Sequence, residues 1–180
     1  MPRRERPRLA PRLRRLYIGG MAIRLEHRIG VMAPPPVIWG LIEDLGGWPR
    51  WNPLYPQVSG RLGYGETLEM TLALPGRPTQ TLRPTVIDWT PNELVHWKLS
   101  ALGGLLKTTR YLEIETLSDT GCIFSNGEFF TGAAARWMPR ALKRSIREGF
   151  AALGEAVKRE AEARVAAEGG ARLSAPSDAA

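Results

Sequence analysis

Residues 140–159 read RALKRSIREGFAALGEAVKR and lie within the longest segment that can form one helix, residues 133–167. Five apolar residues recur at steps of four, four, three and four, which places them on one stripe of a helix: Leu142, Ile146, Phe150, Leu153 and Val157. Pro139 lacks the N–H that a helix interior needs, so we expect a short lead-in turn and then the long helix. A helix of about 30 residues is roughly 40 Å long. Its apolar stripe needs an extended partner, for which the preceding strands are the candidate.

The composition of the chain is typical of a soluble globular protein with one main domain. It has 180 residues, 43% of them hydrophobic and 24% charged, and no run of about 18 apolar residues that could insert into a membrane. The single cysteine, Cys122, cannot form an internal disulfide, which favours a reducing compartment and a cytoplasmic location. With only two histidines beside it, we expect no metal site, and no motif for a cofactor or a phosphate is present.

The net charge of +7 is concentrated at the beginning of the chain. Residues 1–20 contain seven arginines and one glutamate, a net of +6, so the remainder carries about +1. We interpret residues 1–20 as a disordered basic extension, residues 21–167 as the folded domain and residues 168–180 as a disordered tail. The first segment could instead be a translated leader before a true start at Met21. Binding to nucleic acid or to an anionic surface is expected only if residues 1–20 provide it.

Alternating apolar and polar residues predict seven strands, at 23–32, 57–61, 66–74, 79–88, 93–101, 107–116 and 122–131. Between the first two, a short helix at 35–45 begins in a run of prolines and ends at Gly46-Gly47, and a second helical turn follows near Trp48. Tight turns such as 118–121 join consecutive strands, which favours antiparallel pairing. The predicted class is therefore α+β.

This order of elements resembles the polyketide cyclase/dehydrase branch of the START-like (Bet v 1-like, SRPBCC) superfamily. The motifs that carry the resemblance are APPPVIW at 33–39, WPRWNP at 48–53, PTV at 84–86, PNELVHW at 91–97 and EFFTG at 128–132, with Gly149-Phe150 in the long helix. The similarity covers about residues 23–165. It implies a helix-grip fold, in which a curved seven-stranded antiparallel sheet wraps the C-terminal helix around a hydrophobic cavity. It is specific for the fold and not for one function, because the superfamily includes lipid carriers, hormone receptors and cyclases.

If sheet residues that face the long helix line this cavity, the period of two along each strand selects them. The inward set on the last strand is Cys122, Phe124, Asn126, Glu128 and Phe130, and on the preceding strand it is Arg110, Leu112 and Ile114. Arg110 could approach Asn126 or Glu128, and pairing is expected because a buried carboxylate without a partner is costly. Such a polar patch would orient a ligand's carbonyl or hydroxyl in an apolar pocket. The alternative is a structural ion pair near the cavity rim.

The remaining candidates are apolar. Trp48 and Trp51 either gate a pocket entrance or seal the core, and Trp97, Met70 and Leu72 fit a pocket wall as well as they fit ordinary core packing. The complete set of candidate ligand-binding residues is Trp48, Trp51, Met70, Leu72, Trp97, Arg110, Leu112, Phe124, Asn126, Glu128, Phe130, Ile146 and Phe150.

Three functions fit these observations, and the last of them is an interaction module in which the arginines of residues 1–20 dock on nucleic acid or anionic lipid. The first is binding of a small or medium-sized hydrophobic ligand, by a monomer or homodimer and without catalysis. The second is an aromatase/cyclase- or dehydratase-like activity on a polyketide-type ketone, with Arg110, Asn126 or Glu128 transferring protons. His27 and His96 are lone histidines on strands and are expected to be structural rather than general bases.

Overall fold

In the computed structural model, residues 22–174 are described. Strand β1 (Ile23–Val31) is followed by helix α2 (Pro35–Glu43), the 3₁₀ turn η1 (Leu45–Gly47) and helix α3 (Trp48–Trp51). The other strands are β2 (Gln57–Ser59), β3 (Glu69–Leu72), β4 (Gln80–Leu82), β5 (Thr85–Thr90), β6 (Leu94–Ala101), β7 (Leu106–Ser118) and β8 (Gly121–Thr131). The long helix α4 (Arg140–Ser174) comes last. The α+β class and the two short helices after the first strand are confirmed.

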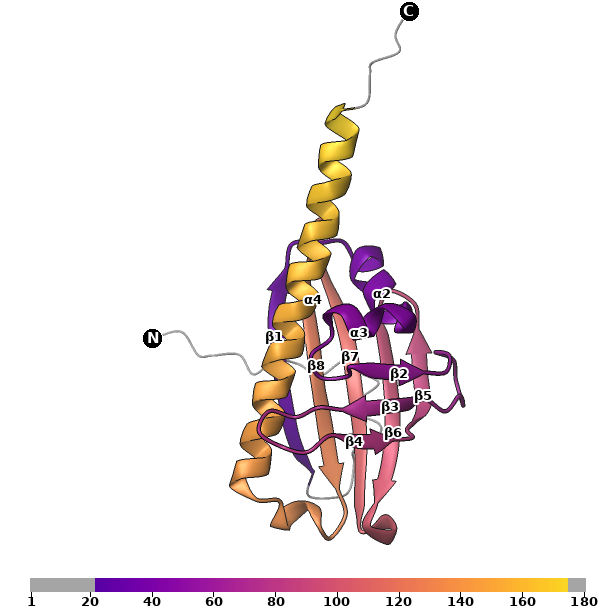
Figure 1. The fold of residues 1–180 in the computed structure, drawn as a ribbon, viewed down its shortest axis with the longest axis vertical. Coiled ribbons are helices and arrows are strands. Elements are labelled where there is room, and N and C mark those ends of the chain that lie inside the picture. Colours follow the sequence, from indigo (N-terminus) through magenta and orange to yellow (C-terminus); the bar gives the residue numbers. More distant parts are fainter. Residues whose placement is uncertain (1–21, 175–180) are drawn as a thin grey trace, which may run out of the picture.

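The strands form two antiparallel sheets. The larger has the order β1-β8-β7-β6-β5 and the smaller the order β2-β3-β4. Backbone hydrogen bonds join them, from the N–H of Leu68 to the carbonyl of Pro84 (3.0 Å) and from the N–H of Val86 to the carbonyl of Glu66 (2.8 Å). Figure 1 shows α4 running along the face of the larger sheet and extending beyond the strands at its C-terminal end. This arrangement is the helix-grip.

The predicted count of seven strands is wrong, because the described residues contain eight. The strand expected at 79–88 is divided at Pro84, which has no N–H to give to a ladder. The part before it, β4, pairs with β3, and the part after it, β5, pairs with β6. The chain therefore changes sheet at this proline.

Helix α4 begins where the sequence predicts. The turn η3 (Ala135–Trp137) leads into it, and the N–H of Lys143 donates to the carbonyl of Pro139 (3.1 Å). Four members of the apolar stripe are buried and the fifth, Leu142, packs against the core. The helix runs to Ser174, past the expected end at Ala167. The predictions for residues 1–20 lie outside the described residues, as do those for 175–180.

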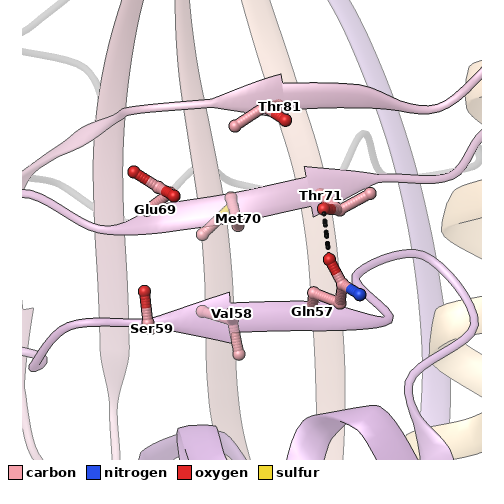
Figure 2. Close-up of a pocket in the computed structure, with 7 residues that line it drawn as sticks. All are labelled: Gln57, Val58, Ser59, Glu69, Met70, Thr71 and Thr81. Atoms are coloured by element: carbon pink, nitrogen blue, oxygen red, sulfur yellow. Dashed lines mark hydrogen bonds between the residues drawn. The ribbon is translucent and has the colours of Figure 1, made fainter.

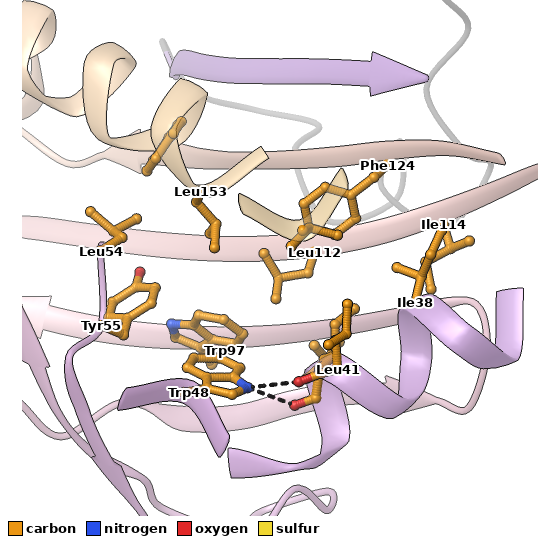
Figure 3. Packing of buried hydrophobic residues seen from close by; sticks show 14 of the residues in the cluster. Ile38, Leu41, Trp48, Leu54, Tyr55, Trp97, Leu112, Ile114, Phe124 and Leu153 are labelled. Atoms are coloured by element: carbon orange, nitrogen blue, oxygen red, sulfur yellow. Dashed lines mark hydrogen bonds between the residues drawn. The ribbon is translucent and has the colours of Figure 1, made fainter. Parts of the chain in front are cut away.

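The hydrophobic core lies between the larger sheet, the two short helices and α4 (Figure 3). Trp48 is buried in it, and its indole N–H donates to the carbonyls of Leu41 and Ile42 at the end of α2, both at 3.1 Å. The side chain of Asn52 accepts from the N–H groups of Leu54 and Tyr55, both at 3.0 Å, and so fixes the loop that leaves α3. None of the helices in the described part of the chain is long and apolar enough to cross a bilayer.

Candidate functional site

A buried arginine is the centre of the candidate site. Arg110, on β7, is only 2% exposed. Its Nε donates to the hydroxyl of Tyr55 (3.2 Å) and its Nη2 to Oδ1 of Asn126 (3.0 Å). Its Nη1 donates to the backbone carbonyls of Tyr111 (3.0 Å) and Gly127 (2.8 Å). The positive charge is therefore held inside the protein by neutral acceptors.

Phe150 connects this cluster to α4. The guanidinium of Arg110 lies 4.0 Å from the centre of the Phe150 ring, which is a close cation–π contact. The side-chain amide of Asn126 donates to the carbonyl of Phe150 (3.1 Å). Because Phe150 contacts Arg110 through its ring and Asn126 through its carbonyl, sheet and helix are held together at the site.

Strand pairing explains why these side chains meet. In the β7–β8 register, Arg110 lies opposite Glu128 and Leu112 lies opposite Asn126. Directly opposite residues point to the same face of a sheet, so all four face α4. The inward set that strand alternation predicts is the observed one for these residues.

The expected ion pair between Arg110 and Glu128 is absent, however. No salt bridge joins them among the described residues, although they are cross-strand neighbours. The guanidinium is satisfied by Asn126, Tyr55 and backbone carbonyls instead. Burial raises the pKa of the Glu128 carboxyl, while the charge of Arg110 and a hydrogen bond from Thr108 oppose this, so that the pKa stays above its ordinary value.

Tyr55 is a site residue that the sequence did not reveal. It lies in the loop after α3, where no periodicity indicates which side chains point inward. Its ring centre is 5.7 Å from that of Trp48 and 6.3 Å from that of Trp97, so the phenol reaches Arg110 from an aromatic wall. Burial raises the pKa of the Tyr55 hydroxyl, Arg110 lowers it and Glu128 raises it, with a net rise. The phenol is therefore neutral and able to donate a hydrogen bond.

Comparison with known proteins places this site in a family. The sequence matches the family model described as polyketide cyclase / dehydrase and lipid transport over residues 22–158. The chain belongs to this family. It is part of the SRPBCC superfamily, as the sequence motifs indicate. A search of the curated proteins gave no match.

Solved structures of low sequence identity share the fold of this polyketide cyclase/dehydrase family member. The ZhuI aromatase/cyclase from Streptomyces sp. R1128 aligns with a TM-score of 0.64 and 19% identity, over 80% of this chain and 96% of that one. Ara h 8.0201 aligns at 0.60 and 13%, over 79% and 99%. Norcoclaurine synthase from Thalictrum flavum, in truncated form, aligns at 0.55 and 13%, over 79% and 95%. At these identities the likeness concerns the fold.

The apolar candidates of this family member all belong to the same core region as the polar cluster. Met70, Trp97, Leu112, Phe124, Phe130, Ile146 and Phe150 are buried, and Trp51 and Leu72 are partly buried against them. Trp48 is 1% exposed and hydrogen-bonded to α2, which favours its sealing the core over its gating an entrance. The structure thus places all the apolar candidates in one hydrophobic cluster, with Met70 and Leu72 contributed by the smaller sheet.

The hollows described on this protein lie elsewhere. One of about 200 Å³ opens on the outer face of the β2–β3–β4 sheet, beside the hydrogen bond from Thr71 to Gln57 (3.2 Å; Figure 2). Another of about 310 Å³ lies between η1 and the turn around Arg61. Both are open to solvent and lined largely by polar groups. An apolar cavity between the sheet and α4 therefore stays a prediction.

Both histidines have positions that suit a structural role. His27 faces α4, where its ring touches the backbone at Gly154, and its Nδ1 is buried without a hydrogen-bond partner in the described residues. His96 lies on the opposite face of the sheet and is 1% exposed, with its Nε2 3.0 Å from a carboxylate oxygen of Glu113. His96 and Glu113 are 17 positions apart in the sequence, and the pairing of β6 with β7 brings them together.

Proposed function

We propose that the protein binds a small or medium-sized hydrophobic molecule that carries a carbonyl or hydroxyl group, between the larger sheet and α4. The observation that carries this proposal is a buried cation and phenol, Arg110 and Tyr55, enclosed by apolar and aromatic side chains. A few polar groups that converge inside an apolar enclosure are the usual composition of a ligand site. The family description, which includes lipid transport, supports the same class of ligand.

Tyr55 supplies the donor for the ligand. Its oxygen accepts from Nε of Arg110, and in the described part of the chain no acceptor is present for its own proton. A hydroxyl that accepts from a cation is polarised and becomes a stronger donor. The phenol is therefore ready to donate to a ligand carbonyl or hydroxyl oxygen.

Glu128 adds a second polar group near this donor, since its charge raises the pKa of the Tyr55 hydroxyl. Burial is the main influence on the pKa of the Glu128 carboxyl and raises it, while Arg110 and Thr108 oppose the rise. A ligand held by Tyr55 would therefore lie beside a carboxyl that keeps its proton more readily than one in water does.

Titration with Prodan, an uncharged naphthyl ketone whose emission moves to the blue in apolar surroundings, tests the proposal. We expect saturable binding with one site per chain. Leu72→Trp fills the inner face of β3 and should weaken binding by about tenfold or more, because it occupies space that the ligand needs. Leu117→Trp is the matched control, since Leu117 is 63% exposed on β7.

The role of the polar cluster is tested by comparing Prodan with dimethylaminonaphthalene, a related dye without the ketone group. Tyr55→Phe should weaken Prodan binding by about tenfold, as expected for loss of one polarised hydrogen bond, and leave binding of the ketone-free dye unchanged. Equal loss for both dyes would show that Tyr55 only shapes the site. Unchanged binding of both dyes in Leu72→Trp would contradict a site between the sheet and α4.

A second candidate, an aromatase/cyclase- or dehydratase-like reaction on a polyketide-type ketone, is favoured by the same residues in another role. A carboxyl with a raised pKa is suited to donate a proton, and Arg110 with Tyr55 would stabilise negative charge on a carbonyl oxygen. Incubation with a linear polyketone chain, followed by chromatography of the products, tests this activity. Glu128→Gln should then lower turnover by about 100-fold while binding is kept.

A further inference from the structure

Three large apolar side chains are exposed at one end of the molecule. Leu102 is 65% exposed in the turn η2 (Leu102–Gly104), Leu105 is 59% exposed just after it, and Trp137 is 73% exposed in η3. The N–H of Ala134 donates to the carbonyl of Leu105 (3.1 Å), which ties the two turns to each other. Figure 1 shows both turns at the end where α4 begins. We call Leu102, Leu105 and Trp137 the apolar tip.

The backbone at the apolar tip holds a leucine in an unfavourable conformation. Leu102 has a φ of 53°, in the left-handed region that residues other than glycine rarely adopt, and Gly103 and Gly104 follow with φ of 63° and 90°. Asparagine tolerates this region better than leucine does. Neither burial nor core packing accounts for leucine here, because most of its side chain is in solvent. Strain at an exposed residue points to a role outside the fold.

Positive charge surrounds the apolar tip. No acidic residue occurs between Glu93 and Glu113 or between Glu128 and Glu148, the two segments that form this end. Exposed basic side chains in these segments include Lys107, Arg136, Arg140 and Arg147. The guanidinium of Arg136 lies 5.0 Å from the centre of the Trp137 ring.

The arginine-rich start of the chain is attached at the same end. Ile23, the first residue of β1, lies opposite Phe130, and the next residue, Thr131, lies opposite Lys107. Residues 1–20, with seven arginines, precede this point in the sequence. The point at which they join the described chain is therefore at the same end of the sheet as the apolar tip.

We propose that this end of the molecule docks on an anionic lipid bilayer, with the apolar tip inserted at the headgroup level. Leucine and tryptophan side chains flanked by cations are the composition of a peripheral membrane-binding surface. The cations would contact anionic headgroups. Nucleic acid is a poorer match, because the two leucines offer no flat face on which bases can stack. This inference does not depend on the proposed ligand site.

Co-sedimentation of the full chain with vesicles tests the proposal. We expect binding to phosphatidylcholine vesicles that contain about 30% phosphatidylserine, weaker binding to phosphatidylcholine alone, and loss of binding in high salt. The variant Leu102→Asn/Leu105→Ser/Trp137→Ser should bind the anionic vesicles at least about tenfold more weakly. It should unfold at the same urea concentration or a higher one, because asparagine relieves the backbone at position 102. Leu117→Ser is the control, an exposed leucine outside the apolar tip.

Three outcomes would overturn the proposal. Deletion of residues 1–20 could abolish vesicle binding while the triple variant binds as tightly as the wild type, which would assign binding to the arginines alone. Duplex DNA could compete fully with the vesicles and bind the triple variant equally well. Finally, sedimentation could show a dimer that the triple variant dissociates, with no vesicle binding by either protein, which would make the apolar tip a contact between two copies of the chain.

Discussion

Arg110 is a buried cation, and no carboxylate of the described residues forms a salt bridge with it. Neutral hydrogen-bond acceptors stabilise its charge instead. Two backbone carbonyls, the Asn126 amide and the Tyr55 hydroxyl accept its hydrogen bonds, and the Phe150 ring covers its face. Buried ions are costly unless they are fully hydrogen-bonded, so each acceptor contributes to the stability of the fold. A core of apolar side chains would avoid this cost, and the proposed ligand site would give the cluster a role that packing alone does not.

The first prediction concerns the hydroxyl of Tyr55. Tyr55→Phe leaves Nε of Arg110 buried without its acceptor and should lower the free energy of unfolding by about 1–3 kcal/mol. Urea denaturation followed by circular dichroism measures it. Tyr64→Phe is the matched control, because Tyr64 is 81% exposed, and should change stability by less than about 0.5 kcal/mol. Equal stability of the two variants would show that Arg110 does not need this acceptor.

The second prediction concerns the pH dependence that Glu128 introduces. Burial raises the pKa of its carboxyl above the ordinary value of 4.5, so the folded protein holds this proton more tightly than the unfolded chain does. Its contribution therefore favours folding below the unfolded pKa and is lost as the pH rises through the folded pKa. Glu128→Gln has no carboxyl to ionise and should not lose this stability, so at neutral pH the variant should be more stable than the wild type.

Urea midpoints of wild type and Glu128→Gln from about pH 4 to pH 8 measure this difference. The two curves should separate as the pH rises. Glu168→Gln, at an exposed position on α4, is the control and should run parallel to the wild type. A variant that is less stable than the wild type at neutral pH would instead indicate a stabilising charge interaction with Arg110.

At this scale strand alternation was a sufficient guide to Arg110, Asn126 and Glu128, because a side chain on a strand has only two faces to choose from. Tyr55 could not be found in the same way. Its direction depends on the two hydrogen bonds that Asn52 accepts in the loop, and such a turn has no periodic pattern. The missing ion pair also depends on local geometry, since Arg110 has nearer acceptors than Glu128.

Among the elements, strand β8 needs a glycine at position 127, because the large side chain of Tyr111 on the neighbouring strand β7 occupies the space beside it. Tyr111 on β7 lies opposite Gly127, and a Cβ at position 127 would meet its hydroxyl and the carbonyl of Leu25. That hydroxyl accepts from Nε of Arg24 (2.9 Å) and donates to Glu26 (2.8 Å), so it is not free to move away. The outer face of the sheet is thus fitted to glycine at this point.

Gly127→Ala should therefore destabilise the protein by about 1–3 kcal/mol or more, as overpacking in a close contact does. Thermal unfolding provides the measurement. Gly30→Ala on the adjacent β1 is the matched control, because a Cβ there meets nothing within 4 Å, and it should be neutral or slightly stabilising. If Gly127→Ala unfolded at the wild-type temperature, the contact with Tyr111 would not constrain β8.

The elements themselves were largely predictable. The stripe of five apolar residues and Pro139 indicated α4 and its start, and alternation indicated most strands within a few residues. The division of the strand at 79–88 was missed, although Pro84 was visible, because proline at an edge and proline at a change of sheet look alike in sequence. The strand pairs of the structure show that the chain changes sheet at Pro84, because β4 pairs with β3 and β5 pairs with β6.

For the whole molecule, we propose that the ligand binds between the larger sheet and α4. The family and the fold followed from the order of elements and a few motifs, since both describe the chain as a whole. The location of a ligand does not follow from them, because the described hollows open on the outside and the inner candidates are buried side chains.

The measurement that tests this claim most directly is the NMR signal of the Arg110 Nε–H group during titration with Prodan. A buried arginine with fixed hydrogen bonds should give a resolved signal, which Arg110→Lys assigns by removing it. We expect this signal to shift and to saturate at one equivalent, while backbone signals of Gln57 and Thr71 at the outer hollow do not change. Shifts at Gln57 and Thr71 with an unchanged Arg110 signal would contradict it.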